Sequence, residues 1–148
     1  MGMEACAVHA TNLPLGMDTF AVDTWSSSYQ ATMPDPYVMI QMRNQPEYQC
    51  ISPSITNNAN PDFDFCCTVE CEVEPCNLEF DIYDADTSLW SPDDYIGTVM
   101  IANLSDANAG QFDMPILDNS GTSRGKRATA QFTEPLLSTR RDRPSPSR

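Results

Sequence analysis

The sequence Tyr83-Asp-Ala-Asp-Thr-Ser-Leu-Trp-Ser-Pro-Asp-Asp-Tyr-Ile-Gly97 contains four aspartates and no lysine, arginine or histidine. Like charges gathered in one loop repel one another unless a cation joins them. Carboxylate oxygens are among the ligands that Ca²⁺ prefers. Two large apolar side chains, Leu89 and Trp90, lie in the middle of the loop. The loop therefore indicates a cation site that touches something apolar or, in the alternative interpretation, a solvated acidic turn.

The segments on either side of this loop have the patterns of β-strands. Residues 78–82 alternate apolar and acidic side chains, and residues 95–101 are rich in β-branched ones. The helix–loop–helix calcium motif needs glycine at the sixth loop position and glutamate at the twelfth. Counted from Asp84, these positions are Leu89 and Tyr95, which excludes that motif. The acidic loop is predicted to join two strands at the edge of a β structure.

The rest of the chain has further strand patterns separated by turn residues and no convincing helix. The predicted strands cover about residues 4–11, 37–42, 48–51, 63–69, 112–116 and 126–132. In the first of them, alternation places Cys6, Val8 and Ala10 on one face and His9 on the other. A long loop, residues 15–34, follows it. These patterns predict an all-β fold, an eight-stranded antiparallel β-sandwich.

Charge divides the chain into a body and a tail. The formal net charge is −13, with −16 in residues 1–137 and +3 in residues 138–148. The tail is polar and rich in proline, serine and arginine, so it is predicted to be disordered. The predicted organisation is one domain in residues 1–135 and a tail in residues 136–148. We expect that a domain with this much negative charge does not bind nucleic acid by neutralising the charge of its phosphates.

The N-terminus has neither the basic start nor the apolar block of a secretory signal, and no apolar run is long enough to span a membrane. A cytoplasmic protein with six reduced cysteines is therefore expected. Cys66 and Cys67 are adjacent in a strand and point to opposite faces, so they cannot chelate together, and no zinc site is expected. Cys71 and Cys76 flank a predicted turn and could form a disulfide in an oxidising compartment.

Several motifs in register resemble the C2 domain, the calcium- and phospholipid-binding β-sandwich. They are Ala10-Thr-Asn-Leu-Pro14, Asp35-Pro-Tyr-Val38, Asn60-Pro-Asp-Phe-Asp-Phe65 and the acidic loop, with Asp84-Ala-Asp86 and Asp94-Tyr-Ile-Gly97. Their order and approximate spacing agree with the family from about residue 4 to residue 134. The chain begins directly on the Leu-Pro strand and adds a strand at the end. The resemblance therefore implies the family's second, circularly permuted (type II) topology.

The resemblance also implies a Ca²⁺ site between loops at one end of the sandwich. Carried across residue by residue, its five aspartates are Asp18, Asp35, Asp84, Asp86 and Asp94. The first loop is longer than the family norm, so Asp23 competes with Asp18 for one role. Asp93 is an extra carboxylate that substitutes for a ligand or faces solvent.

A calcium-switched, peripheral membrane module is the function that this resemblance implies. Bound Ca²⁺ would reverse the repulsion between the carboxylates and anionic headgroups of a phospholipid membrane. The apolar residues Phe20, Trp25, Leu89 and Trp90 would then enter the interface. The alternative for Phe20 and Trp25 is packing that orders the long loop itself.

Two other functions compete with this hypothesis. The first is a Ca²⁺-independent adaptor, in which the acidic loops and the arginine tail contact a protein partner, tuned by phosphorylation at Ser145-Pro146. The second is an enzyme. His9 is the single histidine and lies away from any motif, so no serine or cysteine nucleophile has a histidine partner. The sequence therefore predicts a binding module and not an enzyme.

Overall fold

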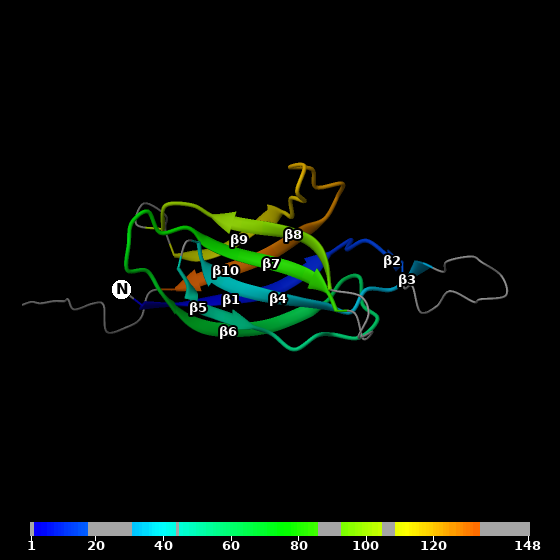
Figure 1. The fold of residues 1–148 in the computed structure, drawn as a ribbon, viewed down its shortest axis with the longest axis horizontal. Coiled ribbons are helices and arrows are strands. Elements are labelled where there is room, and N and C mark those ends of the chain that lie inside the picture. Colours follow the sequence, from blue (N-terminus) through cyan, green and yellow to red (C-terminus); the bar gives the residue numbers. More distant parts are fainter. Residues whose placement is uncertain (1, 18–30, 44, 86–92, 105–108, 134–148) are drawn as a thin grey trace, which may run out of the picture.

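The computed structural model describes residues 2–17, 31–43, 45–85, 93–104 and 109–133, which form a β-sandwich (Figure 1). Two four-stranded antiparallel sheets pack on each other. The first sheet has the order β6 (Asp62–Glu70), β1 (Gly2–Thr11), β10 (Arg127–Thr133), β9 (Gly110–Pro115). The second has the order β5 (Gln45–Ile51), β4 (Pro36–Met42), β7 (Leu78–Asp84), β8 (Asp94–Ile101). The predicted eight-stranded sandwich is confirmed, whereas its type II topology stays a prediction.

A third, two-stranded sheet lies at the base of the long first loop. It consists of β2 (Gly16–Met17) and β3 (Ala31–Thr32). Sequence patterns missed this pair because two residues are too few to show an alternation. Residues 18–30 lie outside the described part of the chain.

The core lies between the two four-stranded sheets and follows from alternation along the strands. Every second residue of a strand points to the same face, so one set of side chains from each sheet meets in the middle. The largest fully buried apolar side chains come from both sheets and from the segment after β9, namely Val38, Ile40, Met42, Val69, Leu78, Ile82, Val99 and Ile116. Burying one such side chain contributes about 1.5–3 kcal/mol. Buried residues alternate along β4 and β10, and the alternation predicted for residues 78–82 is present in β7.

Strand β1 departs from the predicted alternation. Its pairing with β10 shifts between Ala7 and His9, so Val8 is an extra residue in a β-bulge. The bulge reverses the face on which later residues lie, and Met3, Ala5, Ala7 and Ala10 are the β1 residues that pack in the core. The prediction that Cys6, Val8 and Ala10 lie on one face was wrong, because a bulge leaves no mark in the order of apolar residues.

All six cysteines form disulfides: Cys6–Cys66, Cys50–Cys67 and Cys71–Cys76. The first joins neighbouring strands β1 and β6. The second joins β5 to β6, which are edge strands of different sheets. The third closes the connection between β6 and β7. The expectation of reduced thiols was wrong, whereas the disulfide considered for the turn before β7 is present.

The two adjacent cysteines of β6 form disulfides on opposite faces of the strand. Cys66 and Cys67 point to opposite faces, as predicted, and each has a partner on the side to which it points. One strand is thereby linked within its own sheet and across to the other sheet. Because structural disulfides persist mainly in oxidising compartments, these bridges count against the cytoplasmic location predicted from the N-terminus.

Candidate functional site

Three of the predicted calcium ligands converge at one end of the second sheet. Asp84 is the last residue of β7 and pairs with Asp94, the first residue of β8. On its other side Asp84 pairs with Pro36, directly after Asp35. The strand register therefore brings together aspartates that are separated by up to 59 positions in the sequence.

Hydrogen bonds fix the relation between Asp35 and Asp84. The backbone N–H of Asp35 donates to Oδ1 of Asp84 at 2.8 Å, and the N–H of Ala85 donates to the backbone carbonyl of Asp35 at 2.9 Å. The N–H of Asn57 donates to Oδ1 of Asp35 at 2.7 Å. Charge-assisted hydrogen bonds from backbone N–H groups hold carboxylates in fixed positions. The loop before β4, the end of β7 and the turn near Asn57 are thus held as one unit.

The described residues form only part of the predicted site. Asp18, Asp23 and Asp86 lie outside the described ranges, as do the four predicted membrane-contact residues Phe20, Trp25, Leu89 and Trp90. In the part of the chain that the structure describes, no three carboxylates at this end lie mutually within 4.8 Å. The donor type at Asp35, Asp84 and Asp94 fits a hard cation such as Ca²⁺. The complete ligand set stays a prediction.

Asp93 has a partner that sequence reasoning missed. The Tyr37 hydroxyl donates to Oδ2 of Asp93 at 2.6 Å. Burial, followed by this hydrogen bond, raises the pKa of Tyr37 well above its usual value, so the phenol keeps its proton. No sequence pattern connects two residues 56 positions apart, although the β4–β7–β8 pairing brings them close.

Tyr37 also begins a row of three tyrosines across β4, β7 and β8. The Tyr37 and Tyr83 rings stack with centroids 5.5 Å apart, and the Tyr83 and Tyr95 rings meet edge to face at 5.6 Å. These residues are cross-strand partners on the outer face of the second sheet. Such aromatic pairs stabilise a sheet, so the row supports the strand ends that carry the aspartates.

A buried polar network lies beside this row on the same outer face. Asp81 is only 4% exposed, and it accepts hydrogen bonds from Thr98 Oγ1 at 2.5 Å and from Gln41 Nε2 at 2.8 Å. Because Thr98 gives its one hydroxyl hydrogen to Asp81, its hydrogen bond with Tyr95 must be donated by the tyrosine. The alternation of β7 places Asp81 away from the core, so its burial was not expected.

Glu79 extends the network and has a raised pKa. Gln41 Nε2 donates to Glu79 Oε2 at 3.3 Å, and the Arg43 guanidinium lies 3.5 Å from Oε1. Burial raises the pKa of Glu79 to about 7, with further contributions from a hydrogen bond and charge repulsion from Asp81, and Arg43 offsets part of this. The face therefore holds two closely spaced carboxyl groups and one guanidinium.

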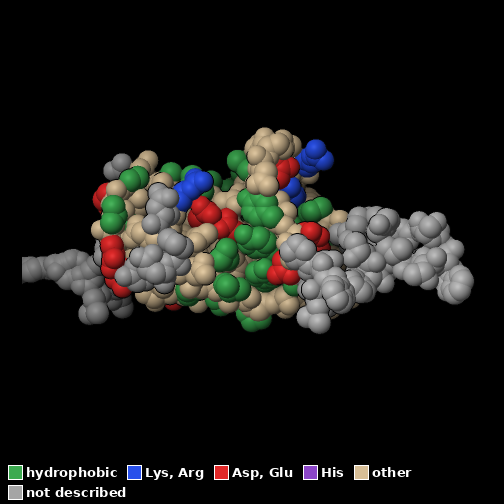
Figure 2. All heavy atoms as spheres, viewed as in Figure 1, with side chains coloured by type: hydrophobic (Ala, Val, Ile, Leu, Met, Phe, Trp, Pro, Cys, Tyr) green, Lys and Arg blue, Asp and Glu red, His purple; other side chains and the backbone are tan. Residues whose placement is uncertain are grey.

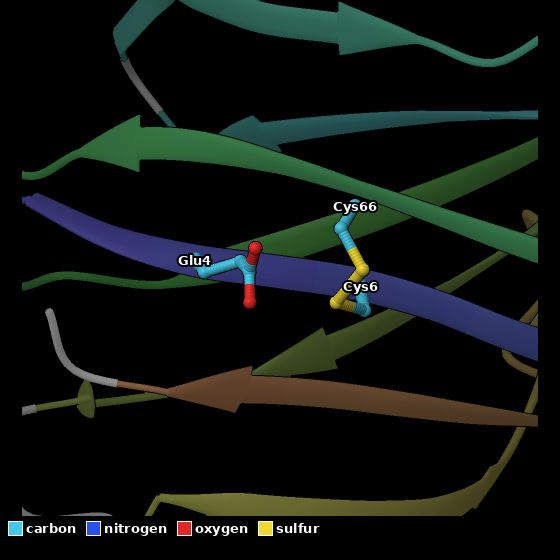
Figure 3. Close-up of side chains that lie close together, drawn as sticks. All are labelled: Glu4, Cys6 and Cys66. Atoms are coloured by element: carbon cyan, nitrogen blue, oxygen red, sulfur yellow. A yellow bond between two sulfur atoms is a disulfide. The ribbon is translucent and has the colours of Figure 1, made fainter.

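Two cysteine groups outside this end also have the spacing of metal ligands. Figure 3 shows Glu4 beside the Cys6–Cys66 disulfide on β1 and β6, and Glu74 lies similarly close to Cys71 and Cys76. Metal ions bind cysteine as the thiolate. Because the sulfur atoms of both groups are joined in disulfides, neither offers a thiolate in this structure.

The fold and the loop end define a β-sandwich of the kind that binds ligands through loops at one end. The family model described as "C2 domain" matches residues 3–116, and the chain belongs to this family. A C2 domain is a membrane-binding module. No curated protein matches the chain.

Solved structures agree with this assignment at the level of the fold. The first C2 domain (domain A) of plant Extended Synaptotagmin 1 is 16% identical, with a TM-score of 0.64, over 91% of this chain and 95% of that one. The calcium-bound pair of C2 domains, A and B, of Extended-Synaptotagmin 2 gives 18% identity and 0.66, over 93% of this chain and 48% of that one. Human GIVD cytosolic phospholipase A2 is 19% identical, with a TM-score of 0.63, over 91% of this chain and 16% of the phospholipase chain.

The phospholipase comparison concerns one part of a longer protein, since this chain spans about a sixth of the phospholipase chains it matches.

Among the described residues, none forms a helix with the length and hydropathy needed to span a membrane.

Proposed function

We propose that this C2 domain binds phospholipid membranes in a Ca²⁺-dependent manner. Asp18, Asp35, Asp84, Asp86 and Asp94 would hold the ions, with Asp23 and Asp93 as substitutes. The apolar loop residues Phe20, Trp25, Leu89 and Trp90 would enter the interface, where tryptophan prefers the boundary between water and lipid tails.

The observation that carries the proposal is the contact between Asp35 and Asp84. Asp35 precedes β4 and Asp84 ends β7, yet a 2.8 Å hydrogen bond joins them, and Asp94 is the cross-strand partner of Asp84. Three aspartates thus come from segments that meet at one end of the second sheet. Repulsion within such a group is relieved by a cation.

Each component has a separate role in this proposal. Bound Ca²⁺ supplies positive charge and coordination positions that accept phosphate oxygens. The backbone N–H groups of Asp35 and Asn57 orient the carboxylates beforehand. The Tyr37 hydroxyl holds the Asp93 carboxylate through a hydrogen bond. Without the ion, the acidic end repels anionic headgroups.

Vesicle sedimentation tests the proposal. The full chain is mixed with vesicles of phosphatidylserine and phosphatidylcholine, with Ca²⁺ or with EGTA. We expect sedimentation only with Ca²⁺, and its loss in Asp84→Asn/Asp86→Asn. Asp113→Asn is the control, because this carboxylate is exposed on β9 in the other sheet and pairs with Arg127. Equal binding in Ca²⁺ and EGTA would contradict the proposal.

Calorimetric titration with Ca²⁺ separates this proposal from the Ca²⁺-independent adaptor, because a silent titration favours the adaptor.

The measured Ca²⁺ affinity also gives information about the compartment in which the domain works. We propose a site peripheral to a membrane, and the three disulfides favour an oxidising compartment over the cytoplasm. Extracellular calcium modules bind with dissociation constants of about 10⁻⁴–10⁻³ M, so an affinity in this range is expected.

A further inference from the structure

The outer face of the second sheet forms a groove distinct from the loop end. Strands β4, β7 and β8 make its floor, and the segment from Met114 to Gly121 makes one wall. The groove has a volume of about 630 Å³. Figure 2 shows acidic side chains among hydrophobic ones on this side of the molecule.

The wall of the groove is anchored to the floor. The N–H of Thr98 donates to the carbonyl of Leu117 at 2.9 Å, and the N–H of Leu117 donates to the carbonyl of Thr98 at 3.0 Å. This close approach requires glycine at position 97, because a Cβ there would lie 2.6 Å from Ile116 Cγ2 and 2.9 Å from the Leu117 carbonyl oxygen. Hydrogen bonds from Ser120 and Thr122 to Asp118 close the turn. The groove is therefore formed before any ligand arrives.

The lining combines negative charge with aromatic rings. Glu79, Asp81 and Asp118 bring three carboxyl groups, of which Asp81 is only 4% exposed, and Arg43, which pairs with Glu79, is the one cation among the described lining residues. Tyr83 and Tyr95 line the same groove. Carboxylates bind guanidinium groups through paired hydrogen bonds, and tyrosine rings stack on them. Phosphate groups would be repelled by this lining. The chemistry fits a ligand that carries arginine.

We propose that the groove binds the arginine-rich segment of residues 138–148 of the same chain. This segment has four arginines, Arg140, Arg141, Arg143 and Arg148, and one aspartate, so its charge of +3 complements the groove. Half of the eight basic residues of the chain lie in this short stretch. The proposal assigns a ligand to a face that the calcium hypothesis does not use.

The route of the chain permits this contact. Strand β10 ends at Thr133, at the end of the sandwich where β7 begins with Leu78 and where Glu79 lies (Figure 1). Fifteen residues follow Thr133, and a chain of this length reaches up to about 50 Å when extended. Strand β7 has seven residues and spans about 23 Å. The tail is long enough to pass around the edge of the sandwich and lie along the groove.

Nuclear magnetic resonance of the full chain tests the proposal, in EGTA so that calcium binding plays no part. The wild type is compared with a variant in which all four tail arginines are changed to glutamine. We expect amide shifts to differ at Gln41, Glu79, Asp81 and Thr98, and not on the outer face of the other sheet. Arg124→Gln is the control, because this cation does not line the groove. Differences confined to residues 134–148 would overturn the proposal.

A competition experiment measures the same contact by affinity. A synthetic peptide of residues 138–148 is titrated into both chains. We expect it to bind the glutamine variant and to bind the wild type roughly tenfold more weakly, because a tethered segment competes at a high effective concentration. Glu79→Gln in the glutamine variant should weaken peptide binding. Equal peptide affinity for both chains would overturn docking within one molecule, as would shifts that vary with protein concentration.

A charge-matched variant tests the preference for guanidinium. Changing the four arginines to lysine keeps the charge and removes the planar group that pairs and stacks. We expect the shifts at Glu79 and Asp81 to decrease relative to the wild type. Shifts equal to those of the wild type would show that charge alone holds the tail, and would overturn the assignment of an arginine-specific groove.

Discussion

The two sheets of the sandwich have the same number of strands but differ in how their outward polar groups are exposed or buried. In the first sheet, the outward residues include the Cys6–Cys66 disulfide and the exposed pair Arg127–Asp113. In the second sheet, Asp81 is buried on the outer face beside the groove, and Asp84 ends the strand at the predicted calcium site. A covalent link thus lies within the first sheet, whereas the second sheet carries clustered carboxylates that cost stability.

Breaking the disulfides should cause the largest loss in the free energy of unfolding. The chain-entropy estimate is about 4 kcal/mol for Cys6–Cys66, about 3 for Cys50–Cys67 and about 2 for Cys71–Cys76. The order follows from sequence separations of 60, 17 and 5 residues. Urea unfolding of the three paired Cys→Ala variants measures it. Equal stability with and without reductant would show that the bridges do not support the first sheet.

Gly97→Ala should have the next largest effect, in the second sheet. The added methyl group would meet Ile116 and the backbone of Leu117 at distances shorter than van der Waals contact. Overpacking of this kind costs about 1–3 kcal/mol. Denaturant unfolding checks the cost, and an amide shift at Leu117 would show that the wall has moved. A variant as stable as the wild type would mean that the wall is loosely held.

Asp84→Asn should separate metal binding from stability. Removing one charged ligand that also accepts the Asp35 N–H should weaken Ca²⁺ binding roughly tenfold, equivalent to about 1.4 kcal/mol. The asparagine oxygen can still accept that hydrogen bond, so unfolding in EGTA should change little. Calorimetry and urea unfolding measure the two effects. Unchanged Ca²⁺ affinity would count against Asp84 as a ligand.

Glu79→Gln should have the smallest effect and should depend on pH. The pKa of Glu79 is raised to about 7 in the fold from an ordinary value of 4.5. The folded state therefore binds more protons than the unfolded state between these values, and stability falls as pH rises through this window. The variant should be more stable than the wild type at pH 8 by on the order of 1 kcal/mol, with the gain lost near pH 4. Thermal unfolding at both pH values measures this, and an equal difference at both would contradict it.

Much of the second sheet was predictable from the sequence, because β4 and β7 alternate without interruption. Residues such as Ile40 and Ile82 then have only one face available to them. The convergence of Asp35, Asp84 and Asp94 was predictable only through the motifs that resemble the C2 family, since distance along the chain carries no such information.

The parts that could not be predicted depend on three-dimensional pairing. The bulge at Val8 is set by the pairing of β1 with β10, and the disulfides depend on which strands become neighbours. Asp81 is buried on the outer face, where it accepts hydrogen bonds from Gln41 and Thr98 of the neighbouring strands, 40 and 17 positions away in the chain. Local patterns report which face a residue occupies, but not what later covers that face.

The Cys6–Cys66 bridge also determines how the domain would respond to mechanical force. Glu4 pairs with Thr133, so pulling the chain from both of these positions would separate β1 from β10 one residue pair at a time. Tension on β1 then reaches Cys6 and passes through the bridge to Cys66. The 60-residue separation enclosed by the bridge would not extend, which shortens the stretched chain by about 200 Å. In an oxidised domain under load, the part of β6 that precedes Cys66 and the whole of β4 and β5 would lie outside the path of the force.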